Sequence, residues 1–521
     1  MPSQDTKNCT KHVFIVHFSS KNLHKCENCV TFAADFNQFK VKMKKTTLFL
    51  MAFATVSSAF AGGLLTNTNQ NAAFVRNFAQ EGKIDLTSIY ANPAGGAFLE
   101  NGWHLSLNNQ TAFQRREIET TFPLFQYNTE TPNATHCFEG KATAPVIPSF
   151  TVSYNKDKWS VSAHFAICGG GGMCKFDKGL GSFEAAYAGM IVPMMQTPGV
   201  LPSLLTQGLI AKGYDNATAS ALAATGQFKG YSVNSFMKGK SYHFGLQLGG
   251  TYKFTDNIAG YVGVRGIYAT ANYNGAVTPT IAYSLQTPGG QVNNTQALNN
   301  YGIDLDCDQT SFGVAIILGV DWKINDKWNV SAKYEAPTRL NLKNNSDIIV
   351  TDDVVKEKAA GILSQFEDGK KVREDIPAML ALGAQYSPIE KLRLSASYHQ
   401  FFDKVSTKFL NKEELIDHNT HEFILGAEYD ICKWLTVSGS WETTRYGMND
   451  EFMNDLSFNL SNHMLGAGVR VKASKRVNFD LGYMCTFYQN REVITQTAAG
   501  PKTDVYDRKN HTFGVGVNID L

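Results

Sequence analysis

Residues 312–335 read FGVAIILGVDWKINDKWNVSAKYE. Every even position from Phe312 to Ile324 is apolar, whereas the odd positions mix small, apolar and charged residues. The same alternation resumes after the turn at Asn325-Asp326. Successive side chains of a β-strand point to opposite faces of the sheet. Two alternating runs joined by a short turn therefore predict a β-hairpin with one apolar face.

The same alternating unit recurs along the chain. Segments with this pattern start near Trp103, Phe150, Trp159, Tyr242, Ile258, Phe312, Trp328, Ala378, Leu392, Phe423, Leu435, Leu465, Val477 and Phe513. They number about 14, and an even number is what a closed bacterial barrel requires. The predicted fold class is all-β: a transmembrane antiparallel β-barrel of about 14 strands. A soluble all-β protein with a two-layer core is the alternative fold, because its strands alternate as well.

The connections between these segments alternate between short and long. The short ones lie near residues 155–158, 255–257, 325–327, 387–390, 430–433 and 472–475. The long ones span residues 114–147, 169–241, 273–310, 337–375, 403–420, 446–461 and 490–509. Short periplasmic turns and long extracellular loops are typical of outer-membrane barrels. Aromatic residues such as Trp159, Phe254 and Trp434 gather beside the short turns, where an aromatic girdle is expected.

Composition excludes several classes of protein. The chain has 18% charged residues and no uninterrupted apolar run of the roughly 18 residues that a membrane-spanning helix needs. It therefore does not resemble a polytopic helical membrane protein. After residues 1–61, Lys and Arg number 40 against 43 Asp and Glu, so no basic excess attracts nucleic acid.

The N-terminal region carries a targeting signal. Residues 43–61 combine a basic start, a short apolar core and an Ala-x-Ala end, which predicts a secretory signal peptide cut after Ala61. Two interpretations fit residues 1–42: either translation starts at Met43, or Cys26 and Cys29 belong to a small metal knuckle. Six cysteines follow the cleavage site, irregularly spaced, and do not predict a disulfide framework.

Residues 62–102 lie between the signal and the first strand and lack a period of two. One interpretation is an N-terminal hatch that plugs the lumen of the barrel, which then spans residues 103–521. The other is a periplasmic tail.

The run LTSIYANPAG at residues 86–95 resembles the Asn-Pro-Ala motif in the hatch of the FadL/TodX family of outer-membrane transporters for hydrophobic compounds. Residues 148–154, 334–338 and 377–378 also resemble barrel segments of that family. The resemblance implies a 14-stranded barrel with a plug, an apolar capture site in the extracellular loops and a kink in the third strand that opens the wall sideways. It places Asn92, Pro93 and Ala94 in the plug.

Two further segments are candidates for those functional parts. The glycines at the end of the third strand cannot form a regular ladder with a packed face, so they are either the strand kink and lateral gate or a flexible loop entry; they are Gly169, Gly170, Gly171 and Gly172. The longest loop contains apolar residues at helical spacing, which predict an amphipathic helix. This helix either forms an apolar capture site or caps the barrel mouth; its residues are Met194, Met195, Leu201, Leu204, Leu205 and Leu209.

We expect no enzyme activity, no cofactor and no metal site. His164 and His399 have serine neighbours on predicted inward faces, but a polar lumen supplies such pairs by chance. Asp304, Asp306 and Asp308 lack the glycine and distal glutamate of a calcium loop.

The expected function is passive uptake of hydrophobic molecules, such as long-chain fatty acids, across the bacterial outer membrane by loop capture, hatch movement and lateral release. The expected partners are a hydrophobic small-molecule ligand, outer-membrane lipid and the barrel assembly machinery, with no nucleic acid, and the protein is expected to be a monomer. The alternatives are a general polar-solute porin and a surface adhesin or structural barrel.

Overall fold

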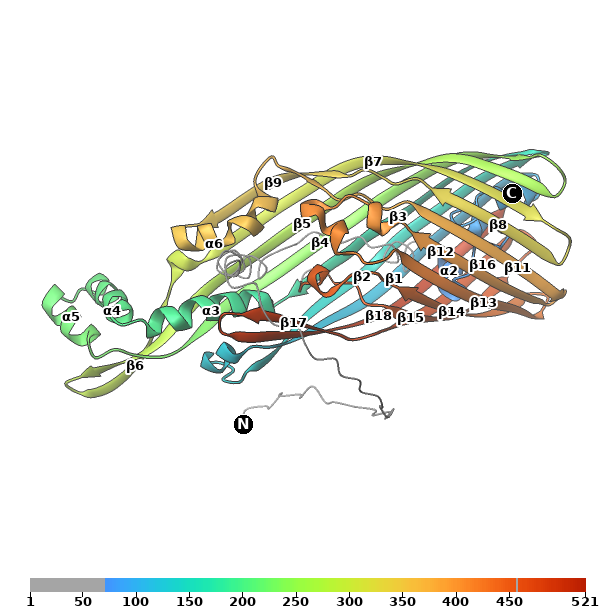
Figure 1. The fold of residues 1–521 in the computed structure, drawn as a ribbon. Helices are drawn as coiled ribbons and strands as arrows, with labels where there is room; N and C mark the ends of the chain where they lie inside the picture. The colour runs from blue at the N-terminus through green and yellow to red at the C-terminus, as the bar shows by residue number, and fades with distance from the viewer. Residues whose placement is uncertain (1–70, 456–457) are drawn as a thin grey trace, which may run out of the picture. The chain divides into compact units, whose positions relative to one another are not determined.

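The computed structural model describes residues 71–455 and 458–521, and in this part of the chain 14 antiparallel strands form a closed ring (Figure 1). The ring strands are β1 (Gly102–Thr121), β2 (Thr135–Lys156), β3 (Trp159–Phe176), β4 (Gln227–Lys253), β5 (Ile258–Thr287), β7 (Ile303–Lys323), β8 (Trp328–Glu335), β11 (Met379–Ile389), β12 (Leu392–Phe401), β13 (Thr420–Cys432), β14 (Leu435–Arg445), β15 (Asn462–Lys472), β16 (Val477–Tyr488) and β18 (Gly500–Asp520). β18 pairs with β1, from His104 opposite Asp520 onward, and closes the ring. The predicted 14-stranded barrel is confirmed. The predicted signal peptide (43–61), the upstream residues 1–42 and residues 62–70 of the predicted hatch lie outside the described residues.

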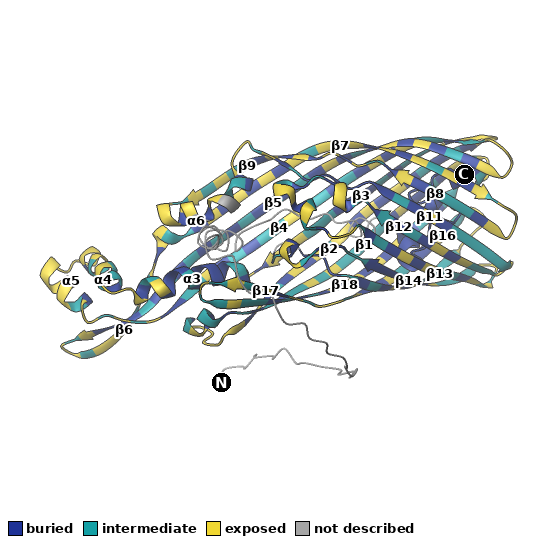
Figure 2. Cartoon of the chain, viewed as in Figure 1, coloured by how far each residue is buried: buried dark blue, intermediate teal, exposed yellow. Residues whose placement is uncertain are grey.

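The strands carry the predicted two-faced pattern (Figure 2). On β7, Phe312 is 67% exposed on the outer face, whereas Ile317 is 0% exposed on the inner face. The outer face of the ring is rich in exposed Leu, Val, Ile and aromatic side chains. Since about 25 cal/mol per Å² favours removing apolar surface from water, such a wall is stable when lipid covers it.

Aromatic side chains surround the short turns. Trp159, Phe254 and Trp434 lie beside three of these turns and are more than half exposed. Trp328 and Tyr386 stack on neighbouring strands with ring centroids 4.3 Å apart. An aromatic belt at one rim is the arrangement that places amphipathic rings at lipid headgroups.

At the other end, the prediction of long loops was partly wrong, because the wall continues far past the 9–11 residues that cross a bilayer. Residues 273–287 and 303–310 belong to β5 and β7, not to a loop. Four further strands pair with the extended wall in this region: β6 (Gly290–Ala297), β9 (Asn341–Val350), β10 (Lys371–Arg373) and β17 (Arg491–Thr497). The strands continue because alternate residues such as Tyr273, Val277 and Ile281 remain buried against an apolar interior.

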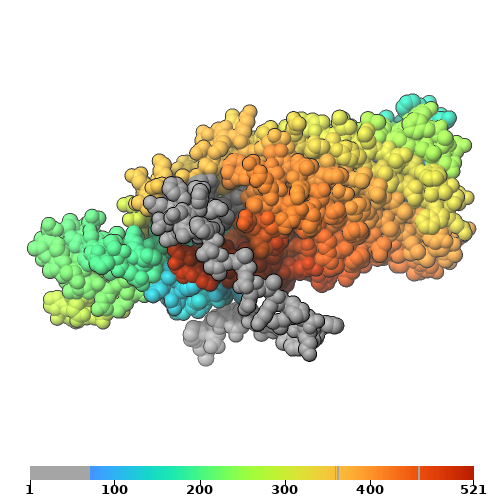
Figure 3. Space-filling model, in the orientation of Figure 1, coloured from blue at the N-terminus to red at the C-terminus, as the bar shows by residue number. Residues whose placement is uncertain are grey.

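Helices fill and extend the end with the long connections. They are α3 (Gly181–Gln196), α4 (Val200–Ala211), α5 (Asn216–Ala223) and α6 (Asp353–Leu363), with 3-10 turns η4 (Pro123–Tyr127), η5 (Asn299–Tyr301), η6 (Ser364–Phe366), η7 (Asp403–Val405), η8 (Phe409–Leu415) and η9 (Asp450–Phe452). In the space-filling view, α4 and α5 project with the β5–β6 hairpin beyond the end of the barrel (Figure 3). Among residues 71–455 and 458–521, no helix has the length and apolarity needed to span a membrane.

Residues 71–101, which we call the inner segment, lie within the ring. They contain α2 (Ala72–Arg76), η2 (Leu86–Ser88) and η3 (Ala94–Phe98). Phe74 and Phe78 are fully buried and pack against inward-facing side chains of the wall, including Met464 and Met484. Because so many of its residues have lost all contact with solvent, the inner segment is packed as a core.

Candidate functional site

The wall of the ring is interrupted between β2 and β3. The two strands are in register up to Ser149 opposite Ala166, and pairing resumes only at Ala142 opposite Cys174. On β3, Gly170 and Gly172 have φ of +97° and +67°, a backbone conformation that glycine adopts without strain. The predicted kink residues Gly169, Gly170, Gly171 and Gly172 therefore lie in strand β3, at a break in the ladder.

The partner strand contributes to the break as well. β2 carries Pro145 and Pro148 between the two paired stretches. Proline has no backbone N–H and cannot donate to a ladder. The two prolines on β2 and the glycines on β3 thus remove regular pairing at the same height of the wall.

A cavity lies at this break. It is lined by Gly170, Gly171 and Gly172, by Tyr242 on the outward face of β4, and by Arg508 and Asn510 on the inward face of β18. Side chains from both faces of the wall therefore contribute to its lining.

The Asn-Pro-Ala residues join the inner segment to strands β4, β5 and β7 of the wall. The Asn92 amide donates to the Lys83 carbonyl and to Asp321 on β7, while its side-chain oxygen accepts from the Gly95 amide. The Pro93 carbonyl accepts a hydrogen bond from Thr251 on β4, at 3.2 Å. Ala94 packs against Tyr261 and Ile317. The motif forms a turn that is hydrogen-bonded to β4 and β7 and packed against β5 and β7.

Ion pairs hold the first half of the inner segment to β13, β15 and β16. The Arg76 guanidinium contacts Glu428 at 2.5 Å and Asp480 at 2.8 Å, and Lys83 contacts the same Glu428 at 2.9 Å. Arg470 pairs with both Asp85 and Asp480. Burial opposes the charge on Asp85, but Arg470 outweighs it and holds the pKa of Asp85 below its usual range.

A second charged group lies under the inner segment. Both ring nitrogens of His399 on β12 lie 2.8 Å from carboxylates, Nε2 from Glu81 and Nδ1 from Glu422. Burial raises the pKa of Glu81, but the positive charge and hydrogen bond of His399, with Lys333, outweigh it and lower the pKa to about 2. Glu81 is therefore ionised at neutral pH.

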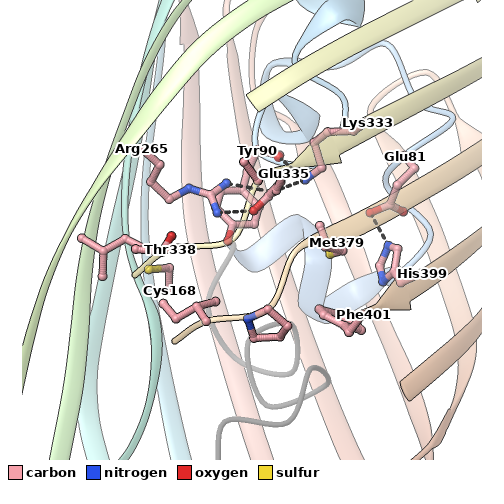
Figure 4. A pocket seen from close by; sticks show the side chains of 14 residues that line it. Glu81, Tyr90, Cys168, Arg265, Lys333, Glu335, Thr338, Met379, His399 and Phe401 are labelled. Atoms are coloured by element: carbon pink, nitrogen blue, oxygen red, sulfur yellow. Dashed lines mark hydrogen bonds and ion pairs between the residues drawn. The ribbon is translucent and has the colours of Figure 1, made fainter. Parts of the chain in front are cut away.

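A pocket lies where Glu81 and Tyr90 of the inner segment face strands β3, β5, β8, β11 and β12 (Figure 4). Arg265 makes a two-pronged contact with Glu335, at 2.6 and 3.0 Å, and its guanidinium lies 4.3 Å from the centre of the Tyr90 ring. Lys333 contacts Glu335 at 2.8 Å and donates to the Tyr90 carbonyl at 2.9 Å. The rest of the lining is largely uncharged, with Cys168, Ile267, Thr338, Ile376, Met379 and Phe401 among it.

The residues of the predicted capture site are brought together in the helices of the long β3–β4 connection. Met194 and Met195 end α3, and Leu201, Leu204, Leu205 and Leu209 form one face of α4. Met195 and three of the leucines are buried in an apolar cluster with α5 and β5, while Met194 and Leu204 are partly buried at its edge. The apolar face is therefore covered by the chain itself. Figure 1 shows α4 at the opposite end of the barrel from α2, so these residues are not part of the pocket or of the break.

The residues considered for catalysis and metal binding lie apart. His164 contacts Thr151 and the Tyr90 ring, and His399 is held by two carboxylates, so neither is paired as the base of a serine nucleophile. Asp304, Asp306 and Asp308 alternate along the exposed face of β7, with Asn272 bonded to two of them. Among the described residues, no cluster of three or more His, Cys, Asp or Glu is arranged to hold a metal ion.

Known structures share this architecture. The crystal structure of a FadL homologue from Pseudomonas aeruginosa matches with a TM-score of 0.58 and 16% sequence identity, over 88% of this chain and 100% of that chain. This chain has the FadL fold. The Pseudomonas putida toluene transporter TodX matches with a TM-score of 0.50 and 12% identity, over 87% of this chain and 98% of that chain. A TodX deletion mutant described as a monoaromatic hydrocarbon channel matches at 0.52 and 12%, over 87% and 100%. No family model matches the sequence, and no curated protein is significantly similar to it.

Several residues of this FadL-type barrel gave no signal in the sequence. Arg76, Glu428, Arg470 and Asp480 meet inside the ring although the first is some 350 to 400 positions away from the others. A charged residue at an inward position of a strand is ordinary in a polar lumen, so the pattern does not say which of them pair. The prolines of β2 were a detectable signal, since proline is rarely tolerated inside a central strand.

Proposed function

We propose that this protein lies in the bacterial outer membrane and lets hydrophobic molecules cross it passively. The observation that carries the proposal is the cavity at the break between β2 and β3. An apolar molecule that leaves a barrel sideways enters lipid directly and never meets bulk water, at a gain of roughly 0.8 kcal/mol per CH₂ kept out of water. The FadL fold, the apolar outer face and the aromatic belt support the same conclusion.

In this proposal the chain supplies three parts of a route. The apolar cluster around α3 and α4, with Met194, Met195 and Leu201, serves as the capture site, since methionine adapts to ligands of varied shape. The inner segment, with Asn92, Pro93 and Ala94, serves as the hatch. Gly169 to Gly172 form the lateral gate. Hatch movement connects the capture site with the gate, and no cofactor or energy source is required.

The test introduces a bulky side chain into the cavity at the proposed gate. Gly171 lines the cavity and does not have a positive φ, so Gly171→Trp introduces bulk there without forcing the backbone. Intact cells of a Gram-negative host that express the protein are given labelled naphthalene and, separately, labelled oleate. We expect the variant to lower uptake of the transported compound to the level of cells without the protein.

The matched control is Gly289→Trp, at the tip of the β5–β6 hairpin, where a side chain meets little. It should leave uptake unchanged. Undiminished uptake in Gly171→Trp would remove the lateral gate from the proposal. Uptake of both compounds that does not depend on the protein at all would contradict the proposed function itself.

A further inference from the structure

Five neighbouring strands of the wall each carry a cation on the outer face, and these cations form one continuous row. Each cation lies directly opposite the next one across a strand pair, where Cβ atoms are only about 5 Å apart. We call this set the basic row. In order from β18 through β1, β2 and β3 to β4, its residues are Lys509, Arg115, Lys141, Lys175 and Lys238.

The basic row begins where the lipid-facing part of the wall ends. On β1 the large apolar residues of the outer face start at Trp103 and stop ten positions later at Phe113, and Arg115 is the next outward residue. At roughly 3.3 Å per residue and a strand tilt of about 40°, this stretch covers roughly 25 Å of height, which is the height of the apolar band on an outer-membrane barrel. On β4, Lys240 is likewise the outward residue next to Tyr242, on the side away from the short turns. The cations therefore start at the level of the lipid headgroups.

The positive charge of this region is only partly neutralised within the protein. Four of the cations contact carboxylates that lie two positions further from the short turns; these carboxylates are Glu117, Glu139, Asp177 and Asp507. Lys240 lies over the Tyr242 ring, 5.7 Å from its centre, and among residues 71–455 and 458–521 neither Lys240 nor Lys238 forms an ion pair. Six cations thus share four carboxylates, all of them on the side away from the apolar band.

The positive charge is confined to one side of the ring. Beyond β4 the same row of paired positions continues with Asn274 on β5, Asp306 on β7 and Asp347 on β9. The pair of Lys141 and Lys175 directly follows the pair at which the ladder between β2 and β3 resumes after the break. Like charges directly opposite each other destabilise a sheet. A row of five such cations beside the break therefore favours an anion outside the protein as its partner.

Phosphate is the anion that fits this position best. A phosphate monoester carries a charge of about −1.5 to −2 at neutral pH and several acceptor oxygens, which both the Arg115 guanidinium and lysine ammonium groups can bind. Strands lie about 4.8 Å apart, so a row across five strands is roughly 19 Å long and offers room for more than one phosphate. The headgroup of a zwitterionic lipid carries its own cation and gains little here.

We propose that the basic row binds the headgroup of an outer-leaflet lipid that carries two phosphate monoesters. The inference rests on the proposed location of the protein in the outer membrane, and it does not depend on which compound is taken up. Lys141 and Lys175 form the centre of the site.

The first test measures fluorescence anisotropy of labelled diphosphoryl lipid A, and of the same lipid with both phosphates removed, on the full-length protein in a non-ionic detergent. We expect the diphosphoryl lipid to bind tighter by roughly tenfold or more, since several cations at a membrane surface act on its phosphates together. Equal affinity for the two lipids would overturn the inference. An excess of inorganic phosphate should leave the lipid bound. Displacement by inorganic phosphate would show a site for the free anion and would also overturn it.

The second test removes the centre of the row. Lys141→Gln combined with Lys175→Gln should weaken binding of diphosphoryl lipid A by roughly tenfold or more. Lys141→Arg combined with Lys175→Arg keeps both charges and should bind it as the wild type does. The matched control is Lys343→Gln combined with Lys371→Gln, because these exposed lysines of β9 and β10 also lie directly opposite each other but belong to no longer row.

The control should bind the lipid as the wild type does. An equal loss in the two glutamine variants would show a response to net charge alone and would overturn the assigned site. Absence of lipid binding in a protein that still takes up its compound would contradict this inference and leave the proposed function standing. Uptake that is independent of the protein, with selective lipid binding intact, would contradict only the proposed function.

Discussion

From β13 to β16 the ladder is irregular only beside one turn, between Asp430 and Cys432, whereas between β2 and β3 pairing stops between Ala142 and Ser149. The inner segment meets these two sides differently. Glu428 and its neighbours hold it with buried ion pairs on the regular side. Beside the broken ladder it is held by neutral contacts, such as Asn155 to the Gly96 carbonyl. The comparison indicates that the inner segment is fixed on the side of β13 to β16. On the side of β2 and β3, its movement costs less free energy.

The largest expected effect is on ion conductance, and it comes from deleting most of the inner segment, which both sides of the ring hold. Deletion of residues 72–98 takes Phe74, Phe78 and their packing out of the ring. We expect stable ion conductance in planar lipid bilayers from the deletion protein and little from the full-length protein, because a 14-stranded ring without contents leaves an aqueous lumen. Equal conductance of the two proteins would contradict a plug. It would also remove the basis for comparing the two sides of the ring that hold the inner segment.

The next prediction sets one side against the other. Glu428→Gln leaves Arg76 and Lys83 buried beside an uncharged amide, and should lower the free energy of unfolding by about 3–5 kcal/mol. Asn155→Ala, beside the broken ladder, removes a neutral hydrogen bond and should cost about 1 kcal/mol. Urea unfolding in lipid vesicles, followed by tryptophan fluorescence, measures both. Equal losses would mean that the inner segment is held alike on both sides.

The contrast between the two sides also marks how far sequence reasoning reaches. The alternation from Phe312 to Ile324 predicted the strands because the outer face has one repeated requirement, contact with lipid, that every strand meets in the same way. Glu428 and Arg76 meet no repeated requirement. Their pairing depends on where the inner segment crosses the ring, and no local pattern encodes that position.

Some parts of the candidate site were predictable from the sequence and others were not, for similar reasons. Gly169 to Gly172 were identifiable because four glycines violate a local rule for strands. Leu201, Leu205 and Leu209 were identifiable as one face of a helix, but what covers that face, α5 and β5, depends on contacts with distant segments. The extension of the strand past residue 273 was not predicted, although the alternation continues there. The bilayer sets a minimum length for a strand but no maximum, so the strand does not have to end at the membrane surface.

The last prediction concerns the pH dependence of the contact between Glu81 of the inner segment and His399 on β12. The pKa of Glu81 is about 2 in the folded protein and near 4.3 in the unfolded chain, so its contribution is present above about pH 5 and is lost as pH falls toward 2. Glu81→Gln should therefore remove on the order of 3 kcal/mol of acid-dependent stability, measured as the difference between the two unfolding curves across pH 5 to 2. Asn155→Ala, which changes no titratable group, should shift the curve without altering its slope. If Glu81→Gln also leaves the slope unaltered, the carboxylate is not held by His399 as the geometry indicates, and acid does not weaken the contact of the inner segment with β12 through this group.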